Sequence, residues 1–240
     1  MFYNNKKLIY YIVVYLFAVQ LSILKNVNIY SSDDFFEYFS KNDNEDSVTL
    51  IINNDVKIFS SNKEINLTNH INKLKFQGIS KDVSSLNLSS VLNGIIFSNE
   101  IKNIEFSNIK VEGQFFYNEN KNITYGNTIH YGSIDYSLNS DSEGLLYYVN
   151  SDYYGKANEI GNCIKIKNAN AIFYKSNLYG DSSCTTNRIV NYNGNGESSI
   201  IINESMVKGK GVNSLFYINN GIIESYNSSF LDFYSNNHPG

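Results

Sequence analysis

The densest group of side chains that could bind a ligand lies between Ile134 and Ile172, the longest interval between repeats of this sequence. Long excursions from a rigid scaffold commonly carry function. The interval holds paired tyrosines beside acidic residues, and tyrosine rings can stack on sugars while phenols and carboxylates bond their hydroxyls. The predicted binding residues are Tyr147, Tyr148, Asp152, Tyr153 and Tyr154. The alternative is one more imperfect repeat, whose paired tyrosines alternate between core and solvent.

Acid-catalysed cleavage of a sugar chain would need a pair of carboxylates rather than a tyrosine surface. Glycoside hydrolysis uses two carboxylates about 5 to 10 Å apart. Glu105 and Asp135 each follow the first apolar residue of successive repeats, so stacking of those repeats would bring them together. Outward, solvated positions explain both residues as well. His130 and the single Arg188 lie in no recognisable catalytic pattern. We therefore predict no catalytic residue, no metal site and no cofactor.

Cys163 and Cys184 are the only cysteines. In an oxidising compartment an even pair most often forms a disulfide, which is the prediction here. Two free thiols are the alternative. Neither cysteine lies in a Cys-X-X-Cys motif or beside a histidine, which argues against thiol catalysis and metal binding.

Five Asn-X-Ser/Thr motifs are candidate N-glycosylation sites if the chain is exported from a eukaryotic cell. With 39 Asn in the chain, several such motifs are expected by chance. The candidate residues are Asn66, Asn87, Asn122, Asn203 and Asn227.

The first residues have the pattern of an export signal. Lys6 and Lys7 precede an apolar run from Leu8 to Val19, and the small residue Ser22 lies near the end of the run. This pattern predicts a signal peptide over residues 1–22 and a secreted or cell-surface protein without a stable membrane span. A membrane anchor extended to Leu24 is the alternative, although it would be shorter than the roughly 20 residues that spanning needs.

Composition limits the possible partners. The 240 residues are 42% hydrophobic, enough for a sizeable core, and carry a net charge of −4. The chain has one arginine, and nucleic-acid affinity depends on clustered arginine and lysine side chains that contact phosphates. We therefore do not expect a nucleic-acid partner.

Residues 23–45 are expected to form an N-terminal segment with one capping helix. Asp34 can cap a helix, Glu37 follows three residues later, and Phe35, Phe36 and Phe39 share one helical face. An amphipathic helix of this kind can cover the unpaired edge at the end of a repeat stack.

Residues 46–240 contain short β-rich runs separated by Asn, Ser, Asp and Gly. Their spacing of 23 to 38 residues and their alternating Ile, Phe and Tyr predict an all-β parallel solenoid of about seven coils. Stacked inward residues would form the core, and Asn would turn the corners. No comparable cap is evident after Phe230, so a truncated end and a last coil that meets a partner are both considered. The runs are Leu50–Ile52, Leu74–Phe76, Ile104–Phe106, Ile134–Tyr136, Ile172–Tyr174, Ile200–Ile202 and Ile223–Ser225.

With its helical segment Asp34–Phe39, its opening Leu50–Asp55 run and its repeats, the chain resembles the right-handed parallel β-helix proteins of the pectin-lyase-like superfamily. Its Asn- and Tyr-rich composition also resembles, more weakly, the scaffold repeat proteins of fungal cellulosomes. The catalytic motifs that the superfamily resemblance would imply are not matched by this sequence. Its only Asp-Asp pair, Asp33-Asp34, lies at the expected helix start.

We expect a secreted or cell-surface, non-enzymatic solenoid that serves as a scaffold or adhesion module. Polysaccharides and cell-surface or scaffold proteins are the expected partners. The alternatives are a divergent polysaccharide lyase or glycoside hydrolase, and a carbohydrate-binding module.

Overall fold

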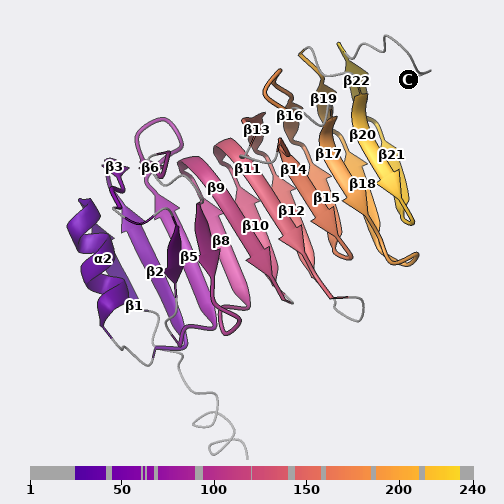
Figure 1. Cartoon of the computed structure of the whole chain (residues 1–240). Coiled ribbons are helices and arrows are strands. Elements are labelled where there is room, and N and C mark those ends of the chain that lie inside the picture. Colours follow the sequence, from indigo (N-terminus) through magenta and orange to yellow (C-terminus); the bar gives the residue numbers. More distant parts are fainter. Residues whose placement is uncertain are drawn as a thin grey trace, which may run out of the picture.

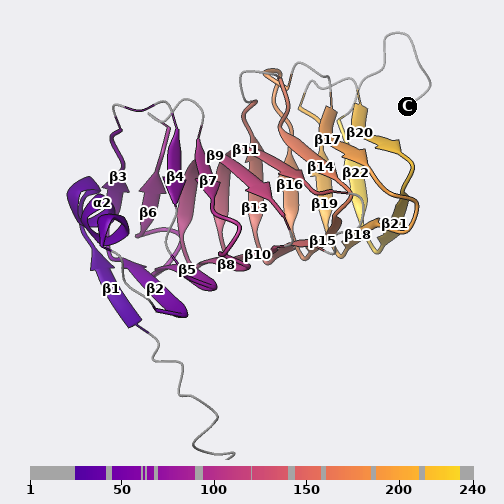
Figure 2. The same cartoon turned by 60° about the horizontal axis from the view of Figure 1, so that its bottom comes forward.

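The protein, seen in a computed structural model, is a parallel β-helix. The chain winds along one axis from a helix at its first end to strand β22 near the other (Figures 1 and 2). The structure describes residues 25–41, 45–60, 62, 64–67, 70–89, 94–119, 121–139, 144–157, 161–184, 188–210 and 214–232. The predicted signal peptide and the acidic residues Asp141, Glu143 and Glu159 lie outside these ranges.

One wall of the helix is a parallel sheet of nine strands, here called the first sheet. Each of its strands pairs with a strand from the next coil, so the sheet grows by one strand per turn of the chain. Its strands are β1 (Lys25–Ile29), β2 (Ser47–Ile52), β5 (Lys73–Gly78), β8 (Asn103–Ser107), β10 (Asn122–Gly126), β12 (Leu145–Val149), β15 (Asn170–Tyr174), β18 (Ser199–Asn203) and β21 (Ile222–Tyr226).

The other walls belong to a second sheet of thirteen strands. β9 (Lys110–Asn118) and β11 (Ile129–Ser137) run through both of these walls. The second wall is completed by β3 (Asp55–Lys57), β6 (Ser85–Asn87), β13 (Asp152–Gly155), β16 (Asn177–Tyr179), β19 (Met206–Lys208) and β22 (Ser229–Leu231). The third wall is completed by β4 (Ile65–Leu67), β7 (Ile95–Phe97), β14 (Ile164–Lys167), β17 (Arg188–Asn193) and β20 (Ser214–Asn219).

The core consists of side chains that stack on their equivalents in the next coil. On the first sheet a buried column of aromatic rings has centroid separations between 4.5 and 5.5 Å. Parallel strands lie about 4.8 Å apart, which is also a comfortable distance for stacked rings. Strand pairing and ring stacking therefore favour the same coil spacing. The column contains Phe76, Phe106, Tyr125, Tyr148 and Phe173.

A ladder of buried hydroxyls fixes the corner after the first sheet. From β8 onward, each strand of the first sheet is followed by a residue in the left-handed region, such as Asn127 with φ 52° and Asn150 with φ 50°. From β10 onward the next residue is a serine or threonine, and each of these serine hydroxyls accepts an N–H from the preceding coil. Ser176 accepts a bond from the N–H of Ser151 at 3.2 Å and donates to the carbonyl of Tyr174 at 2.9 Å. Asparagine therefore turns this corner, as expected, because it tolerates left-handed backbone.

Asparagine amides also bond from coil to coil on the surface. Asn127 donates to Asn108 at 2.7 Å, and Asn219 donates to Asn193 at 3.0 Å.

The predicted capping helix is present as α2 (Ser32–Ser40). Its N-cap is Ser31, whose hydroxyl accepts the N–H of Asp34, and the Asp34 carboxylate in turn accepts the N–H of Tyr30 at 3.0 Å. Asp34 therefore supports the cap and is not the cap residue itself. Phe35 and Tyr38 are buried, while Phe36 and Phe39 pack against the core as half-buried residues.

The coil register corrects several of the predicted repeats. Ile134–Tyr136 lies on the third wall, and Ile172 and Tyr174 point outward because Ala171 and Phe173 occupy the buried positions. A slip of one residue moves a strand's side chains to the opposite face. Three strands of the first sheet, β1, β10 and β12, were not among the seven predicted repeats. Equivalent positions in successive coils are consequently 19 to 30 residues apart in the sequence. Leu74 pairs with Ile104, 30 residues later, and Ile104 pairs with Ile123, 19 residues later.

Cys163 and Cys184 are joined by a disulfide, with Cα atoms 5.5 Å apart. Both residues are buried. The bond links the start of β14 to the turn that follows β16, and so connects successive coils.

Lys121 is an unusual component of the interior. It is 1% exposed, and its ammonium donates to the carbonyls of Ser98 at 2.6 Å and Ile101 at 2.8 Å. Burial lowers its pKa to about 8, nearby Lys102 acts in the same direction, and Glu119 opposes both. The folded state therefore carries an energetic cost for keeping this side chain charged at neutral pH.

We predict that Ser176→Ala lowers the free energy of unfolding by about 1–3 kcal/mol, because the buried N–H of Ser151 loses its acceptor. Ser228→Ala is the matched control. Ser228 accepts the N–H of Ser205 at 3.1 Å in the same ladder, but it is partly exposed, so water can replace its hydroxyl. Urea denaturation of both variants measures the difference. Equal losses would contradict a buried hydroxyl ladder.

We predict that stability rises with pH between about 8 and 9.5 because of Lys121. In this range folded Lys121 loses its proton while the unfolded side chain, with a pKa of about 10.5, keeps it, so the unfolded state binds more protons. Above about pH 10 the buried tyrosines act oppositely, since burial raises the pKa of residues such as Tyr148. Denaturation midpoints of the wild type and Lys121→Met test this. The same slope in both proteins would exclude Lys121 as the cause.

Candidate functional site

The tyrosines and the aspartate predicted to bind a ligand lie in three different environments. Tyr148 and Tyr153 are fully buried in the core, where a ligand cannot reach them. Tyr147 points outward from the first sheet. Asp152 and Tyr154 point outward from β13 on the second wall, so they are the only two of the five that share a surface.

Tyr154 is the middle member of a stacked tyrosine ladder on the second wall. Strand pairing aligns Tyr131 with Tyr154 and Tyr154 with Tyr179. The ring centroids are 4.7 Å and 4.6 Å apart, and the planes differ by 12° and 13°. All three residues are partly exposed. Because the ring faces cover one another, the ladder presents mainly ring edges and phenol hydroxyls to solvent.

A glycine follows each tyrosine of the ladder and explains why the chain can turn there. Gly132 pairs with Gly113 and with Gly155 in the neighbouring coils. A Cβ on Gly132 would lie 1.7 Å from the carbonyl oxygen of Gly113, so no other residue fits. The Tyr-Gly dipeptide recurs at residues 131, 154 and 179 and also at the buried Tyr125, so it is a sequence signal that narrows the search for this ladder to four tyrosines.

Charged side chains flank the ladder. The Lys110 ammonium lies 5.1 Å from the Tyr131 ring centroid, and the Lys210 ammonium lies 4.7 Å from that of Tyr179. These distances allow cation–π attraction. Asp152 accepts a bond from Asn177 at 2.8 Å and lies 3.5 Å from the ammonium of Lys81.

The same surroundings affect the acidity of the ladder phenols. Burial is the largest cause that raises the pKa of Tyr154, followed by Tyr179, Asp152 and Tyr131. Burial and Asp152 likewise raise the pKa of Tyr179. The phenols of Tyr154 and Tyr179 are therefore protonated at neutral pH and can donate hydrogen bonds.

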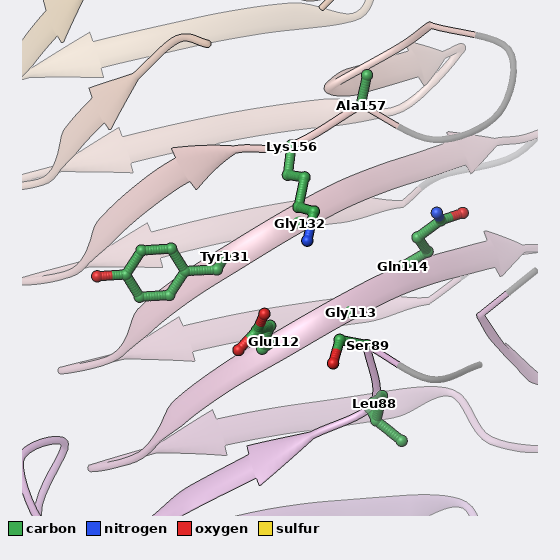
Figure 3. A pocket seen from close by; sticks show the side chains of 9 residues that line it. All are labelled: Leu88, Ser89, Glu112, Gly113, Gln114, Tyr131, Gly132, Lys156 and Ala157. Atoms are coloured by element: carbon green, nitrogen blue, oxygen red, sulfur yellow. The ribbon is translucent and has the colours of Figure 1, made fainter. Parts of the chain in front are cut away.

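A small pocket opens beside Tyr131 and the Gly113–Gly132 pair (Figure 3). Its volume of about 50 Å³ suits a small chemical group rather than a whole ligand. In Figure 3 Lys156 reaches over the strand that carries Gly132, and Glu112 lies on the neighbouring strand. The lining residues are Leu88, Ser89, Glu112, Gly113, Gln114, Tyr131, Gly132, Lys156 and Ala157.

A larger groove of about 600 Å³ lies on the outer side of the first sheet. Its lining combines aliphatic residues with amides and hydroxyls, and Tyr147 stands in the same outward column as Ile172 and Ile201. The lining residues are Asn122, Gly144, Leu145, Asn168, Asn170, Ile172, Asn195, Glu197, Ser198, Ser199 and Ile201.

The carboxylates considered for acid catalysis are not brought together. Glu105 lies on the first sheet, 2.9 Å from Lys75, and Asp135 lies on the third wall, 2.8 Å from Lys165. The hypothesis of a Glu105–Asp135 pair is therefore wrong, because their strands belong to different walls. Within the described ranges no cluster of three or more His, Cys, Asp or Glu could hold a metal ion.

His130 belongs to the core. Its Nδ1 lies 2.7 Å from the hydroxyl of Tyr148, and its ring stacks on that of Tyr125 with centroids 5.0 Å apart. Burial lowers its pKa to about 3, although the Gly113 backbone opposes the shift. His130 is therefore neutral at physiological pH and buried away from any substrate.

The candidate glycosylation residues differ in exposure. Asn66, Asn122 and Asn227 are exposed, whereas Asn87 and Asn203 are half-buried. The amide of Asn87 also donates to Glu112 at 3.2 Å.

Neither a membrane-spanning helix nor a known relative helps to assign a function. Among the described residues, no helix has the length and apolar character needed to cross a membrane. Searches against protein-family models, curated proteins and solved structures find no match to the chain. The superfamily resemblance inferred from the repeats therefore stays a prediction, and the function has to be argued from the surface itself.

Proposed function

We propose that the protein is a secreted or cell-surface, non-enzymatic β-solenoid that acts as a scaffold or adhesion module. Its partner is a polysaccharide bound along the second wall. The observation that carries this proposal is the ladder of Tyr131, Tyr154 and Tyr179, which repeats the same donor group once per coil. A polymer with regularly spaced hydroxyls suits such a repeating surface.

The chemistry of the ladder favours hydrogen bonding over ring stacking. The rings stack face to face from Tyr131 through Tyr154 to Tyr179, while Lys110 lies near Tyr131 and Lys210 near Tyr179. A sugar would therefore meet the phenol edges and the adjacent Asp152 and Lys210. The small pocket beside Tyr131 could accept one polar substituent of the same chain.

Coil-to-coil ion pairs support a structural role for the outward carboxylates. Besides Glu105 and Asp135, Glu204 lies 3.7 Å from Lys175 and Asp232 lies 3.0 Å from Lys208. These pairs connect neighbouring coils, so their positions are explained without catalysis.

The groove on the first sheet favours a second candidate, a carbohydrate-binding module that uses a different face. Its amides and hydroxyls could bond a neutral sugar chain over Leu145, Ile172 and Ile201. Binding through this groove would depend on the first sheet and not on the ladder.

We predict that the triple variant Tyr131→Phe, Tyr154→Phe, Tyr179→Phe binds insoluble polysaccharide at least about tenfold more weakly than the wild type. Loss of hydrogen bonds worth about 1 kcal/mol each accounts for this size, because about 1.4 kcal/mol corresponds to a factor of ten. Phenylalanine retains the stacked rings. The assay is a pull-down over a panel of polysaccharides, with soluble sugar products measured in the same samples.

Tyr147→Phe is the matched control, since it removes one outward phenol from the first sheet. We expect it to bind as the wild type does. Loss of binding in the control alone would favour the groove, and unchanged binding of the triple variant would exclude the ladder. Release of soluble products would contradict a non-enzymatic role, and binding to no polysaccharide would contradict the proposed partner.

A further inference from the structure

The tyrosine ladder has a second chemical property that needs no bound partner. Tyr131, Tyr154 and Tyr179 are held nearly parallel at 4.7 Å and 4.6 Å, with their edges accessible from solvent. This stacking brings the Cε carbons beside each hydroxyl near those of the neighbouring coil. These carbons share the unpaired electron when a tyrosine is oxidised to its radical.

We propose that this ladder is a site of oxidative tyrosine cross-linking, in which a carbon–carbon bond joins Tyr154 to Tyr131 or to Tyr179. The oxidant is hydrogen peroxide used by a heme peroxidase. The product is an intramolecular dityrosine that fastens one coil covalently to the next. The inference goes beyond polysaccharide binding and holds whether or not that binding occurs.

The reaction balances with hydrogen peroxide alone. Each of two tyrosines gives one electron and its phenolic proton to the peroxidase, and two phenoxyl radicals result. A bond forms between a Cε carbon of each ring. The two hydrogens on those carbons then move to the phenolic oxygens, which restores both aromatic phenols. Peroxide takes up the two electrons and two protons and leaves as two molecules of water, so the protein loses two hydrogen atoms.

Access and geometry together distinguish this ladder from the other tyrosines in the described part of the chain. Tyr125 and Tyr148 are stacked with centroids 4.5 Å apart, but both are fully buried. Tyr30, Tyr217 and Tyr226 are 61%, 44% and 51% exposed, yet none of them stacks on another tyrosine in the described residues. The buried pair is stacked but cannot be reached by an oxidant. The exposed tyrosines can be reached but have no second tyrosine ring beside them.

The middle position of Tyr154 allows a sharp test. Tyr154→Phe leaves Tyr131 and Tyr179 two coils apart with an unreactive ring between them. Tyr131→Phe also removes one phenol, but it leaves the Tyr154–Tyr179 pair intact. Both substitutions keep a six-membered ring in the stack, so the fold is retained, which circular dichroism verifies.

The experiment treats the dilute, folded protein with horseradish peroxidase and hydrogen peroxide. Dityrosine fluorescence gives the yield, gel electrophoresis separates monomer from cross-linked oligomer, and peptide mass spectrometry locates the loss of two hydrogens. We expect the wild-type monomer to contain the cross-link. Tyr154→Phe should lower its yield at least tenfold, whereas Tyr131→Phe should lower it no more than two- to threefold. Tyr217→Phe should leave the intramolecular yield unchanged.

Three results would overturn the proposal. One is a wild-type yield in the Tyr154→Phe monomer, and another is a cross-link that maps to Tyr125 and Tyr148. The third is dityrosine found only in oligomers, which would assign the reaction to isolated exposed tyrosines. None of these results depends on polysaccharide binding, so failure here is distinguishable from failure of the proposed function.

Discussion

The structure depends on parallel pairing of each strand with its equivalent in the next coil. This pairing sets a separation of about 4.8 Å along the axis, and each side chain of a paired strand then lies above a counterpart from the previous turn. Buried rings such as Phe106 and Tyr125 stack for this reason, at 4.8 Å. The same separation aligns the surface amides, ion pairs and outward tyrosines. One backbone constraint therefore determines both the composition of the core and the regularity of the surface.

The interior shows how such a core can include polar groups. Several buried tyrosine hydroxyls bond other polar side chains or the backbone, as Tyr117 does with Tyr125 at 2.7 Å and Tyr153 with the Gly132 carbonyl at 2.8 Å. A buried hydroxyl costs little when it has a partner and much when it has none. The tyrosine-rich composition is thus compatible with a solenoid because the repeated geometry supplies those partners.

The sequence was sufficient to predict the parallel β-helix and its capping helix, because alternation of apolar residues and the aromatic face of the helix survive in the local pattern. The register of the coils, that is, which residue of each strand points into the core, was harder to predict from the sequence. Around Ile172 both the inward and the outward residues are apolar, so the pattern does not distinguish Ala171 from Ile172 as the buried residue.

The sites were harder still to predict. Glu105 and Asp135 have similar local sequences, and only the long strand β11 places Asp135 on another wall. Tyr131 was not identified because its relation to Tyr154 and Tyr179 appears only when coils of unequal length are aligned. The Tyr-Gly dipeptide is a local trace of this alignment, since a glycine is needed after Tyr131, where Gly132 lies against Gly113.

The link between Cys163 and Cys184 has a mechanical consequence. Hydrogen bonds between coils run along the axis, so tension applied in that direction would separate coils one after another instead of shearing a whole sheet at once. Each released coil would lengthen the chain by an amount set by its own residue count. The covalent bond between sulfur atoms would withhold the segment between the two cysteines from that extension, and it would thereby limit how far this part of the protein can lengthen under load.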